Sequence, residues 1–184
     1  LSQCYNFFYD QLEKSNLFLQ GIIDTAGCPM DDKMVDWLFA NPLSDGGQFT
    51  GIADNIMKYG VVPQSAMAET YSSENTTRLN RLLSLKLRQY GLELRDMKQQ
   101  GKSAADITAR KEEMLKTVYR ILAQTLGEPP AQFTWTLRDK EGNAVSTDTY
   151  TPQQFYRKFA GGDLKHDYVM LMNDPSREYY RLYE

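Results

Sequence analysis

Two cysteines and one histidine are the residues of this chain that could perform nucleophilic chemistry. Cys4 and Cys28 are its thiols, and His166 is its imidazole. Cys4 falls on the first turn of an expected helix, where the positive end of the helix dipole lowers a thiol pKa. No neighbour in sequence can act as its base, and the aromatic residues Tyr5 and Phe8 share its element. We therefore interpret Cys4 as a small residue that fills a gap in the core.

His166 lies in the polar stretch Lys165-His166-Asp167, where a single imidazole is most often simply solvated. A structural zinc site needs about four ligands, and the cysteines and histidine of this chain are widely scattered. No phosphate-cradling glycine loop is present either. The sequence therefore predicts no metal site and no cofactor.

A glycine pair, Gly46-Gly47, interrupts the chain between two expected helices, within the loop 44–48. Glycine adopts positive φ at little cost and lets another backbone approach closely. By these residues alone, the pair fits either a tight turn or a surface that accepts a second chain, and both interpretations stay open.

Composition and charge narrow the classes of partner. A net charge of −3 and a pI of about 5.3 disfavour nucleic acid, because phosphate binding needs a clustered basic surface. No run of 18 apolar residues occurs, so no membrane span is predicted. Two cysteines are too few for a disulfide framework, and no secretory leader pattern is found, so we expect a cytoplasmic protein. Leu1 abuts a helical pattern and the stretch 179–184 is aromatic-rich, so both ends are expected to continue into further structure.

Hydrophobic periodicity predicts an α+β fold that is mostly helical. We expect helices at 3–26, between Asp31 and Asn41, from Phe49 to Gly60, at 76–98 and from Ser103 to Gly127, then a β-hairpin across the turn 139–143, a helix from Thr151-Pro152, a buried strand at 168–172 and a turn at 173–175. The second helix is expected to turn Met34, Val35, Leu38 and Phe39 inward. The helices at 76–98 and 103–127 form a hairpin with charges on its outer faces, and Leu79, Leu82, Leu83 and Leu87 belong to its apolar set.

Ten short motifs occur in order along the whole chain, and together they resemble one family. They include Leu1-Ser2-Gln3 before an aromatic helix, Asn41-Pro42 leading to Asp45-Gly46-Gly47-Gln48, Lys58-Tyr59-Gly60-Val61-Val62-Pro63, Glu69-Thr70-Tyr71, Gly127-Glu128-Pro129-Pro130 and Asn173-Asp174-Pro175. This pattern is similar to that of the bleomycin hydrolase and aminopeptidase C family of papain-like cysteine peptidases.

The resemblance implies a papain-like fold, with a helical half and a β-rich half. Residues 1–72 correspond to the helical half, 73–128 to a family-specific helical insertion, and 129–184 to a β-hairpin and the start of the β-rich half. It also implies a cytoplasmic homohexamer that removes N-terminal residues from peptide substrates by thiol chemistry.

The resemblance carries a binding role to only four residues. In papain-like peptidases the second glycine of the corresponding pair aligns its backbone with an extended substrate, and the matching position is Gly47. Gln48 and Phe49 follow at positions bordering the pocket for the second substrate residue. We therefore expect Gly46, Gly47, Gln48 and Phe49 to bind substrate.

The catalytic residues of the family have no counterpart in this chain. The resemblance places the nucleophilic cysteine before Leu1 and the histidine base and its asparagine after Glu184, whereas Cys4 and His166 match other positions. We thus expect a cysteine aminopeptidase as the full-length protein, and no activity from this chain alone. The competing hypothesis is a helical protein-interaction module without enzymatic activity, which uses the charged hairpin from Thr76 to Leu126. Nucleic acid is a more distant third, suggested by an arginine stripe that acidic residues interrupt.

Overall fold

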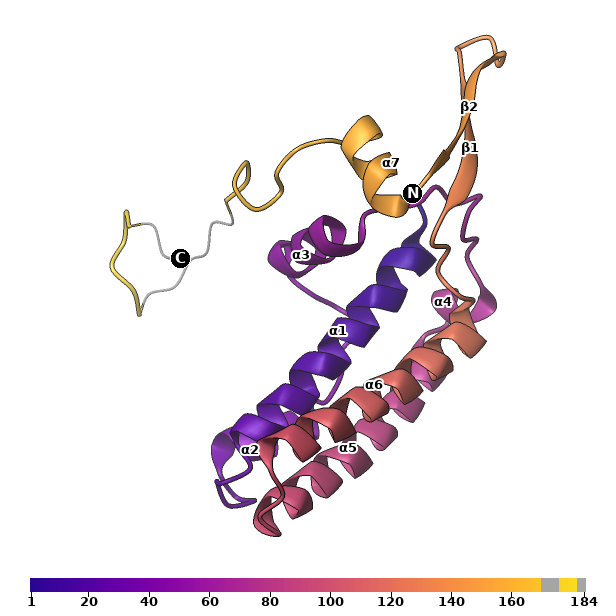
Figure 1. Ribbon diagram of the computed structural model, residues 1–184. Coiled ribbons are helices and arrows are strands. Elements are labelled where there is room, and N and C mark those ends of the chain that lie inside the picture. Colours follow the sequence, from indigo (N-terminus) through magenta and orange to yellow (C-terminus); the bar gives the residue numbers. More distant parts are fainter. Residues whose placement is uncertain (170–175, 182–184) are drawn as a thin grey trace.

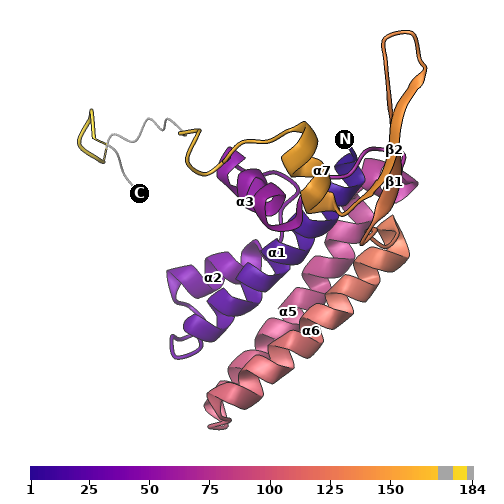
Figure 2. The ribbon, with the colours of Figure 1, turned by 45° about the horizontal axis from the view of Figure 1, so that its top comes forward.

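Three long helices form the body of the protein in the computed structural model, which describes residues 1–169 and 176–181 (Figure 1). The elements are α1 (Gln3–Asp24), α2 (Lys33–Ala40), α3 (Phe49–Tyr59), α4 (Tyr71–Glu74), α5 (Thr77–Gln99), α6 (Ala104–Leu126), β1 (Phe133–Arg138), β2 (Ala144–Tyr150) and α7 (Pro152–Phe159). The helices α1, α5 and α6 pack side by side, α3 packs on α1, and α7 packs on α3 (Figure 2). The expected α+β, mostly helical fold is confirmed.

Two polar residues satisfy the N-terminus of α1. The Ser2 hydroxyl accepts the Tyr5 N–H at 3.0 Å. The Glu69 carboxylate accepts the N–H groups of Gln3 at 2.8 Å and Cys4 at 3.1 Å. The first N–H groups of a helix have no partner within the helix, and these bonds satisfy three of them in α1. The Glu69 carboxylate also lies at the positive end of the α1 dipole. Segment 63–71 is thereby tied to the start of α1.

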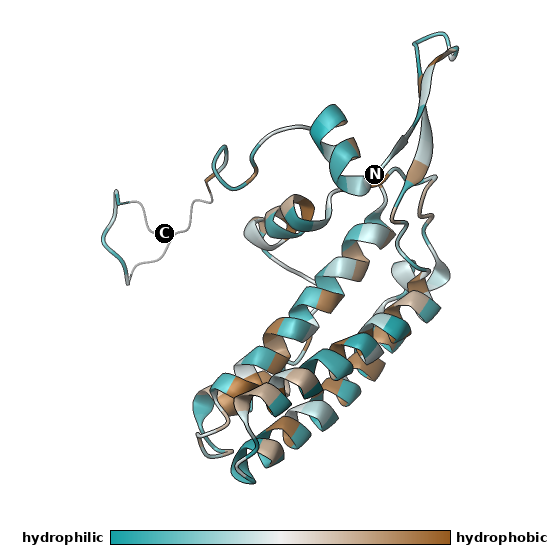
Figure 3. Cartoon of the chain, viewed as in Figure 1, coloured by the Kyte–Doolittle hydropathy of each residue, from teal (hydrophilic) through white to brown (hydrophobic). Residues whose placement is uncertain are grey.

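The core lies where the α5–α6 hairpin packs against α1. Fully buried apolar side chains meet there from all three helices, among them Phe8, Leu19 and Ile22 of α1, Leu83, Leu87 and Leu94 of α5, and Met114, Val118 and Leu122 of α6. Each such side chain stabilises the fold by about 1.5–3 kcal/mol. Figure 3 shows apolar residues along these helices, while α7 is mostly hydrophilic. Residues of the segments 1–72 and 73–128 both contribute to this core. The division of the chain into a helical half and an insertion at these bounds stays a prediction.

Several predicted boundaries and faces need correction. Helix α1 ends at Asp24 rather than near residue 26, because Thr25 bonds its hydroxyl to the Gly21 carbonyl at 2.7 Å and the next turn tightens. Met34 is exposed, since α2 rests on α1 by a single edge that buries Val35. Leu82 is exposed as well, because the neighbouring Leu83 occupies the side of α5 that faces the core.

The β-hairpin is antiparallel, and only its base is buried. Phe133 pairs with Tyr150, and both rings contact Phe155 of α7. The far end projects from the body (Figure 1). Its turn is closed by Asp139, whose carboxylate accepts the Asn143 N–H at 2.7 Å. The predicted hairpin and its turn are confirmed.

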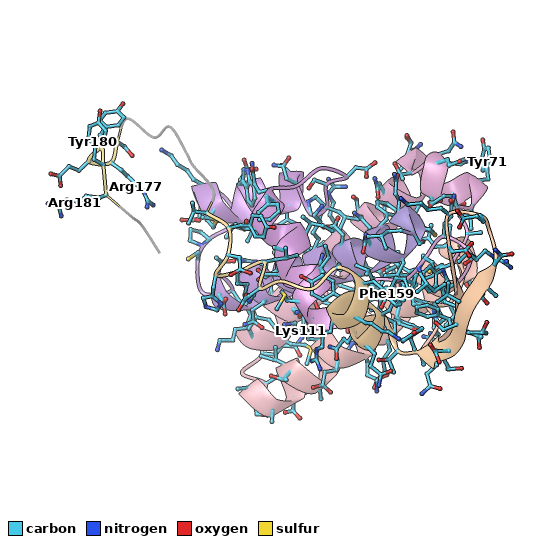
Figure 4. The ribbon with its side chains drawn as sticks, turned by 90° about the horizontal axis from the view of Figure 1, so that it is seen from above. Tyr71, Lys111, Phe159, Arg177, Tyr180 and Arg181 are labelled. Atoms are coloured by element: carbon cyan, nitrogen blue, oxygen red, sulfur yellow. The ribbon has the colours of Figure 1, made fainter. Side chains whose placement is uncertain are left out.

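The chain after α7 departs from the prediction. The expected start of α7 at Thr151-Pro152 is confirmed, and Thr151 and Gln154 form a reciprocal capping box there. Tyr168 and Val169, expected at the start of a buried strand, are exposed and not in a strand. The remainder of that strand and the turn 173–175 lie outside the described residues. Arg177, Tyr180 and Arg181 lie apart from the helical body (Figure 4).

The end of α3 meets the start of α7 at Gly60, so a substitution at this residue tests how the two helices are packed. It has φ 75° and ψ −159°, a conformation essentially restricted to glycine. A Cβ at this position would lie 2.3 Å from the Pro152 carbonyl carbon. We expect Gly60→Ala to lower the free energy of unfolding by about 3 kcal/mol or more, measured by urea denaturation. Gly27→Ala, where a Cβ meets no atom within 4 Å, is the control; equal stability of the two variants would contradict this packing.

Candidate functional site

The four residues expected to bind substrate lie together in one open hollow. Its volume is about 620 Å³, and it lies between α1 and α3 with the loop 44–48 along its rim. Gly46, Gly47, Gln48 and Phe49 all line it and are all exposed. The other lining residues are Asp10, Glu13, Lys14, Leu17, Asp45, Thr50, Gly51, Ile52, Asp54, Asn55 and Lys58. The structure thus gathers the predicted set on a concave surface, while its binding role stays a prediction.

Side chains of α1 hold the glycine loop in place. Lys14 donates hydrogen bonds from Nζ to the carbonyls of Ser44 at 3.0 Å and Gly46 at 2.8 Å, and it pairs with Asp10. The Gln11 amide also donates to the Ser44 carbonyl, at 3.1 Å. Because a rigid helix supplies both donors, the loop has a defined position before any ligand arrives.

A second anchor ties the same loop to α5. The carboxylate of Asp45 accepts a hydrogen bond from the hydroxyl of Thr76, the residue that precedes α5. The loop is therefore held from the body on one side and from the helical hairpin on the other.

The glycines serve this loop by leaving space rather than by adopting an unusual backbone. Neither Gly46 nor Gly47 has positive φ, so neither uses the left-handed conformation that glycine allows. A Cβ on Gly46 would meet no atom within 4 Å, and one on Gly47 would meet only the Lys14 Nζ at 3.9 Å. Nothing in the described fold therefore requires glycine here; a side chain at either position would simply enter the hollow.

The backbone of Gly47 is available for pairing. Within residues 1–169 and 176–181, its N–H and C=O have no hydrogen-bond partner. Gln48, the N-cap of α3, likewise forms no side-chain capping bond there. Phe49 is exposed, and its ring centroid lies 5.9 Å from that of Tyr168. An exposed donor and acceptor beside an aromatic ring suit an extended peptide, which pairs through its main chain.

A partly buried polar network at the edge of the hollow was not found from the sequence. The Glu13 carboxylate accepts hydrogen bonds from the Lys58 ammonium and the Tyr59 hydroxyl. Tyr59 stacks on Tyr9, with ring centroids 3.8 Å apart and planes inclined by 15°. Lys58-Tyr59 belongs to a motif that carries the family resemblance, but nothing in the sequence pairs it with Glu13, 45 residues away.

This network separates two hollows. Glu13 and Lys58 line the one beside Gly47 and also a second hollow of about 780 Å³, between α1 and α6. Burial opposes ionisation of Glu13, but the hydrogen bonds from Lys58 and Tyr59 outweigh it and hold the pKa of Glu13 below its usual value. Glu13 therefore stays negatively charged at neutral pH, where it balances the lysine.

The interpretation of Cys4 as a core residue is confirmed. Its side chain is fully buried, and Sγ lies 3.5 Å from the Leu126 carbonyl. Burial raises the pKa of the thiol, and the negative charge of Glu69 raises it further. A neutral thiol is a poor nucleophile, because the thiolate is the reactive form.

His166 has a local partner at the surface. Its Nδ1 lies 2.6 Å from the Asp163 carboxylate, which lowers the pKa of Asp163, and its side chain is exposed. Cys28 follows the C-terminal end of α1, at the opposite end of that helix from Cys4. In the described part of the chain, neither thiol hydrogen-bonds to the imidazole, and no three Cys, His, Asp or Glu residues form a group able to hold a metal ion.

Comparison with known proteins assigns the chain to a family. The profile of the Peptidase C1-like family matches residues 1–184. The chain belongs to this family. Aminopeptidase C of Lactobacillus delbrueckii subsp. lactis is 43% identical over 97% of this chain and 39% of its own length. Bleomycin hydrolase of Homo sapiens is 36% identical over 99% of this chain and 41% of its own length.

A solved structure shows the same arrangement of elements as this Peptidase C1-like chain. PepW from Lactobacillus rhamnosis HN001 superposes with a TM-score of 0.87 at 46% sequence identity, covering 90% of this chain and 37% of that one. The resemblance to aminopeptidase C and bleomycin hydrolase is thereby confirmed, and with it the papain-like fold class. The chain spans about two fifths of the length of these relatives. No helix among the described residues combines the length and apolar character of a membrane span.

The Glu13 network gives stability a defined dependence on pH. The pKa of Glu13 is lower in the folded state than its ordinary value of 4.5. Its contribution to the free energy of unfolding is therefore present above that value and is lost as pH falls through the lowered pKa. We expect Glu13→Gln to be less stable than the native chain by up to about 1 kcal/mol at neutral pH, with the difference vanishing in acid. Urea unfolding across this range measures it, and Glu112→Gln, in the adjacent hollow, is the control. A difference that grows in acid would contradict the network.

Proposed function

We propose that this chain forms the helical, peptide-binding part of a cytoplasmic cysteine aminopeptidase that removes N-terminal residues from peptides. The observation that carries the proposal is the unpaired backbone of Gly47, displayed in an open hollow by a loop that Lys14 and Asp45 hold. An extended peptide chain pairs with such a backbone by strand addition. The family membership and the names of the relatives support peptide substrates.

Binding and catalysis are divided between this chain and the rest of the proposed enzyme. A thiolate nucleophile needs an adjacent base, and the described residues contain no such pair. We propose that the nucleophile, the oxyanion-stabilising group and the base come from polypeptide beyond residues 1–184, and that the complete enzyme is a homo-oligomer, a hexamer by the family resemblance.

The first test is the activity of the chain by itself. We expect the purified 184-residue polypeptide to hydrolyse aminoacyl substrates no faster than buffer, because its thiols lack a base. The measurement is release of a fluorescent amine, with and without a thiol-alkylating reagent, after the intact mass of 21.2 kDa has been verified. Turnover that alkylation abolishes would overturn the division proposed here.

The second test addresses the glycine loop in the longer enzyme. Gly47→Ala places a methyl group in the hollow without displacing any neighbour. We therefore expect unchanged thermal stability but a kcat/KM for peptides lowered about tenfold or more, the effect of losing roughly one main-chain hydrogen bond and close contact. Gly27→Ala, equally unobstructed and remote from the hollow, should keep full activity. If both variants were equally active, Gly47 would not bind substrate, and the role proposed for the glycine loop would be wrong.

A further inference from the structure

Asp45-Gly46 is the one place in the sequence where an aspartate or an asparagine precedes a glycine. The main-chain nitrogen that follows an aspartate can attack the carboxyl of that same aspartate, because the reacting atoms are already joined and close a five-membered ring. A Cβ on the following residue crowds this nitrogen and restricts the rotation that ring closure needs, whereas glycine has no Cβ. Gly47 extends the freedom of the main chain on the far side. The pair therefore has the residue types that favour this reaction most.

The structure leaves the peptide group between Asp45 and Gly46 unbonded. Lys14 holds the loop through the carbonyls of Ser44 and Gly46, which lie on either side of this group. In the part of the chain that the structure describes, the Asp45 carbonyl and the Gly46 N–H have no hydrogen-bond partner. Both residues are exposed, so water reaches them. Ring closure turns this peptide group about the Cα–C bond of Asp45, and none of its hydrogen bonds has to break.

One described contact restrains the reacting carboxyl. The Asp45 carboxylate accepts a hydrogen bond from the Thr76 hydroxyl, which ties it to the start of α5. Thr76 forms no side-chain capping bond within α5, so this hydroxyl serves the loop rather than the helix. Asp45 is exposed and Thr76 is half-buried, so water can exchange with the bond. The contact therefore slows the approach of the carboxyl to the Gly46 nitrogen and does not prevent it.

We propose that Asp45-Gly46 is a site of spontaneous covalent modification, at which Asp45 converts to isoaspartate through a cyclic imide. The Gly46 nitrogen forms a bond to Cγ of Asp45. The nitrogen gives up its proton and the protonated carboxyl gives up its hydroxyl group, and together they leave as one water. Water then adds to the imide: opening at Cγ restores Asp45, and opening at the α-carbonyl leaves a main chain that runs through Cβ and Cγ. Water is the only co-reactant, and the mass of the chain is unchanged.

The product changes the loop that carries Gly47. In isoaspartate, the carbon of the former side-chain carboxyl becomes a main-chain amide, so the Thr76 hydroxyl loses its carboxylate acceptor at that position. The main chain between residues 45 and 46 also gains one carbon, a bond length of about 1.5 Å. The contact with Thr76 is the anchor of this loop on the side of the helical hairpin, opposite the anchor on α1. Modification therefore releases the loop from α5.

The first experiment measures the product in the folded chain. The purified 184-residue polypeptide is aged at neutral pH and physiological temperature, with circular dichroism to follow its helix content. It is then digested with endoproteinase Asp-N, which cuts before aspartate and not before isoaspartate. We expect resistance at Asp45 to grow with time at constant mass, while cutting before Asp54 stays complete. Gly46→Ala, whose Cβ meets no atom within 4 Å, should keep the same helix content and accumulate little resistance. No resistance in the native chain, or equal resistance in the variant, would overturn the proposal.

The second experiment tests the restraint from Thr76. Thr76→Val should raise the initial rate of isoaspartate formation in the folded chain about fivefold, the weight of one exposed hydrogen bond. In concentrated urea the rates of the variant and the native chain should be equal, because the unfolded chain lacks the contact. Thr77→Val, at the adjacent exposed residue of α5, is the matched control and should keep the native rate. An unchanged rate in Thr76→Val, or the same increase in urea, would show that the contact does not restrain the carboxyl.

The third experiment relates the modification to peptide binding, and this consequence rests on the function proposed for the chain. The longer enzyme is aged in the same way, and its isoaspartate content and its kcat/KM for a peptide are measured in the same samples. We expect kcat/KM to fall in proportion to the isoaspartate fraction, and Gly46→Ala to lose less of its own starting value. Isoaspartate without loss of activity would refute the substrate role of the loop and confirm the modification site. Absence of isoaspartate would refute the modification site and leave the proposed function untouched.

Discussion

The burial of one face of α1 against the α5–α6 hairpin is the constraint on which the other features depend. Phe8, Leu19 and Ile22 turn toward the hairpin and fix the rotation of α1 about its axis. Because side chains on a helix are separated by fixed angles, this rotation also decides where Lys14 and Glu13 point. The apolar packing of α1 therefore also sets the positions of the loop 44–48 and of the contact between Glu13 and Lys58.

The loop 44–48 is held by polar contacts, each of which would be weak alone. Exposed ion pairs contribute little to stability, yet Lys14 bonds to two carbonyls of one loop, and Asp45 ties that loop to the residue before α5. Together these contacts hold the backbone of Gly47 outward with its hydrogen-bonding groups unpaired. A preorganised loop loses less conformational entropy when a ligand binds, which suits recognition of a flexible peptide.

Helix α5 contributes both to the core and to the position of the loop 44–48. Its buried leucines complete the core, and the residue that precedes it, Thr76, donates its hydroxyl to the Asp45 carboxylate of the loop. The packing of the helical hairpin therefore also helps to fix the loop that carries Gly47.

The local structure and the family could be deduced from the sequence alone. Helix starts at Ser2, Ser103 and Thr151 follow from side chains that bond to backbone N–H groups within three residues, and the turn closed by Asp139 is equally local. The motifs that carry the family resemblance are short and need no tertiary knowledge. For these reasons the order of the longer helices, the β-hairpin and the loop at Gly46-Gly47 were predicted correctly. The four-residue helix α4 was not predicted, and Tyr168 and Val169 do not form the strand that was expected there.

Only the tertiary structure decided which side chains are buried and how charges are paired. Leu82 and Leu83 are adjacent and chemically identical, and packing against α1 alone makes one core and the other surface. The helix dipole at Cys4 suggested a lowered thiol pKa, whereas burial and Glu69, which lies 65 residues away, raise it. Glu13 and Lys58 are likewise distant in sequence. Burial and electrostatic pairing depend on contacts between segments far apart in the chain, and no local pattern of residues encodes those distances.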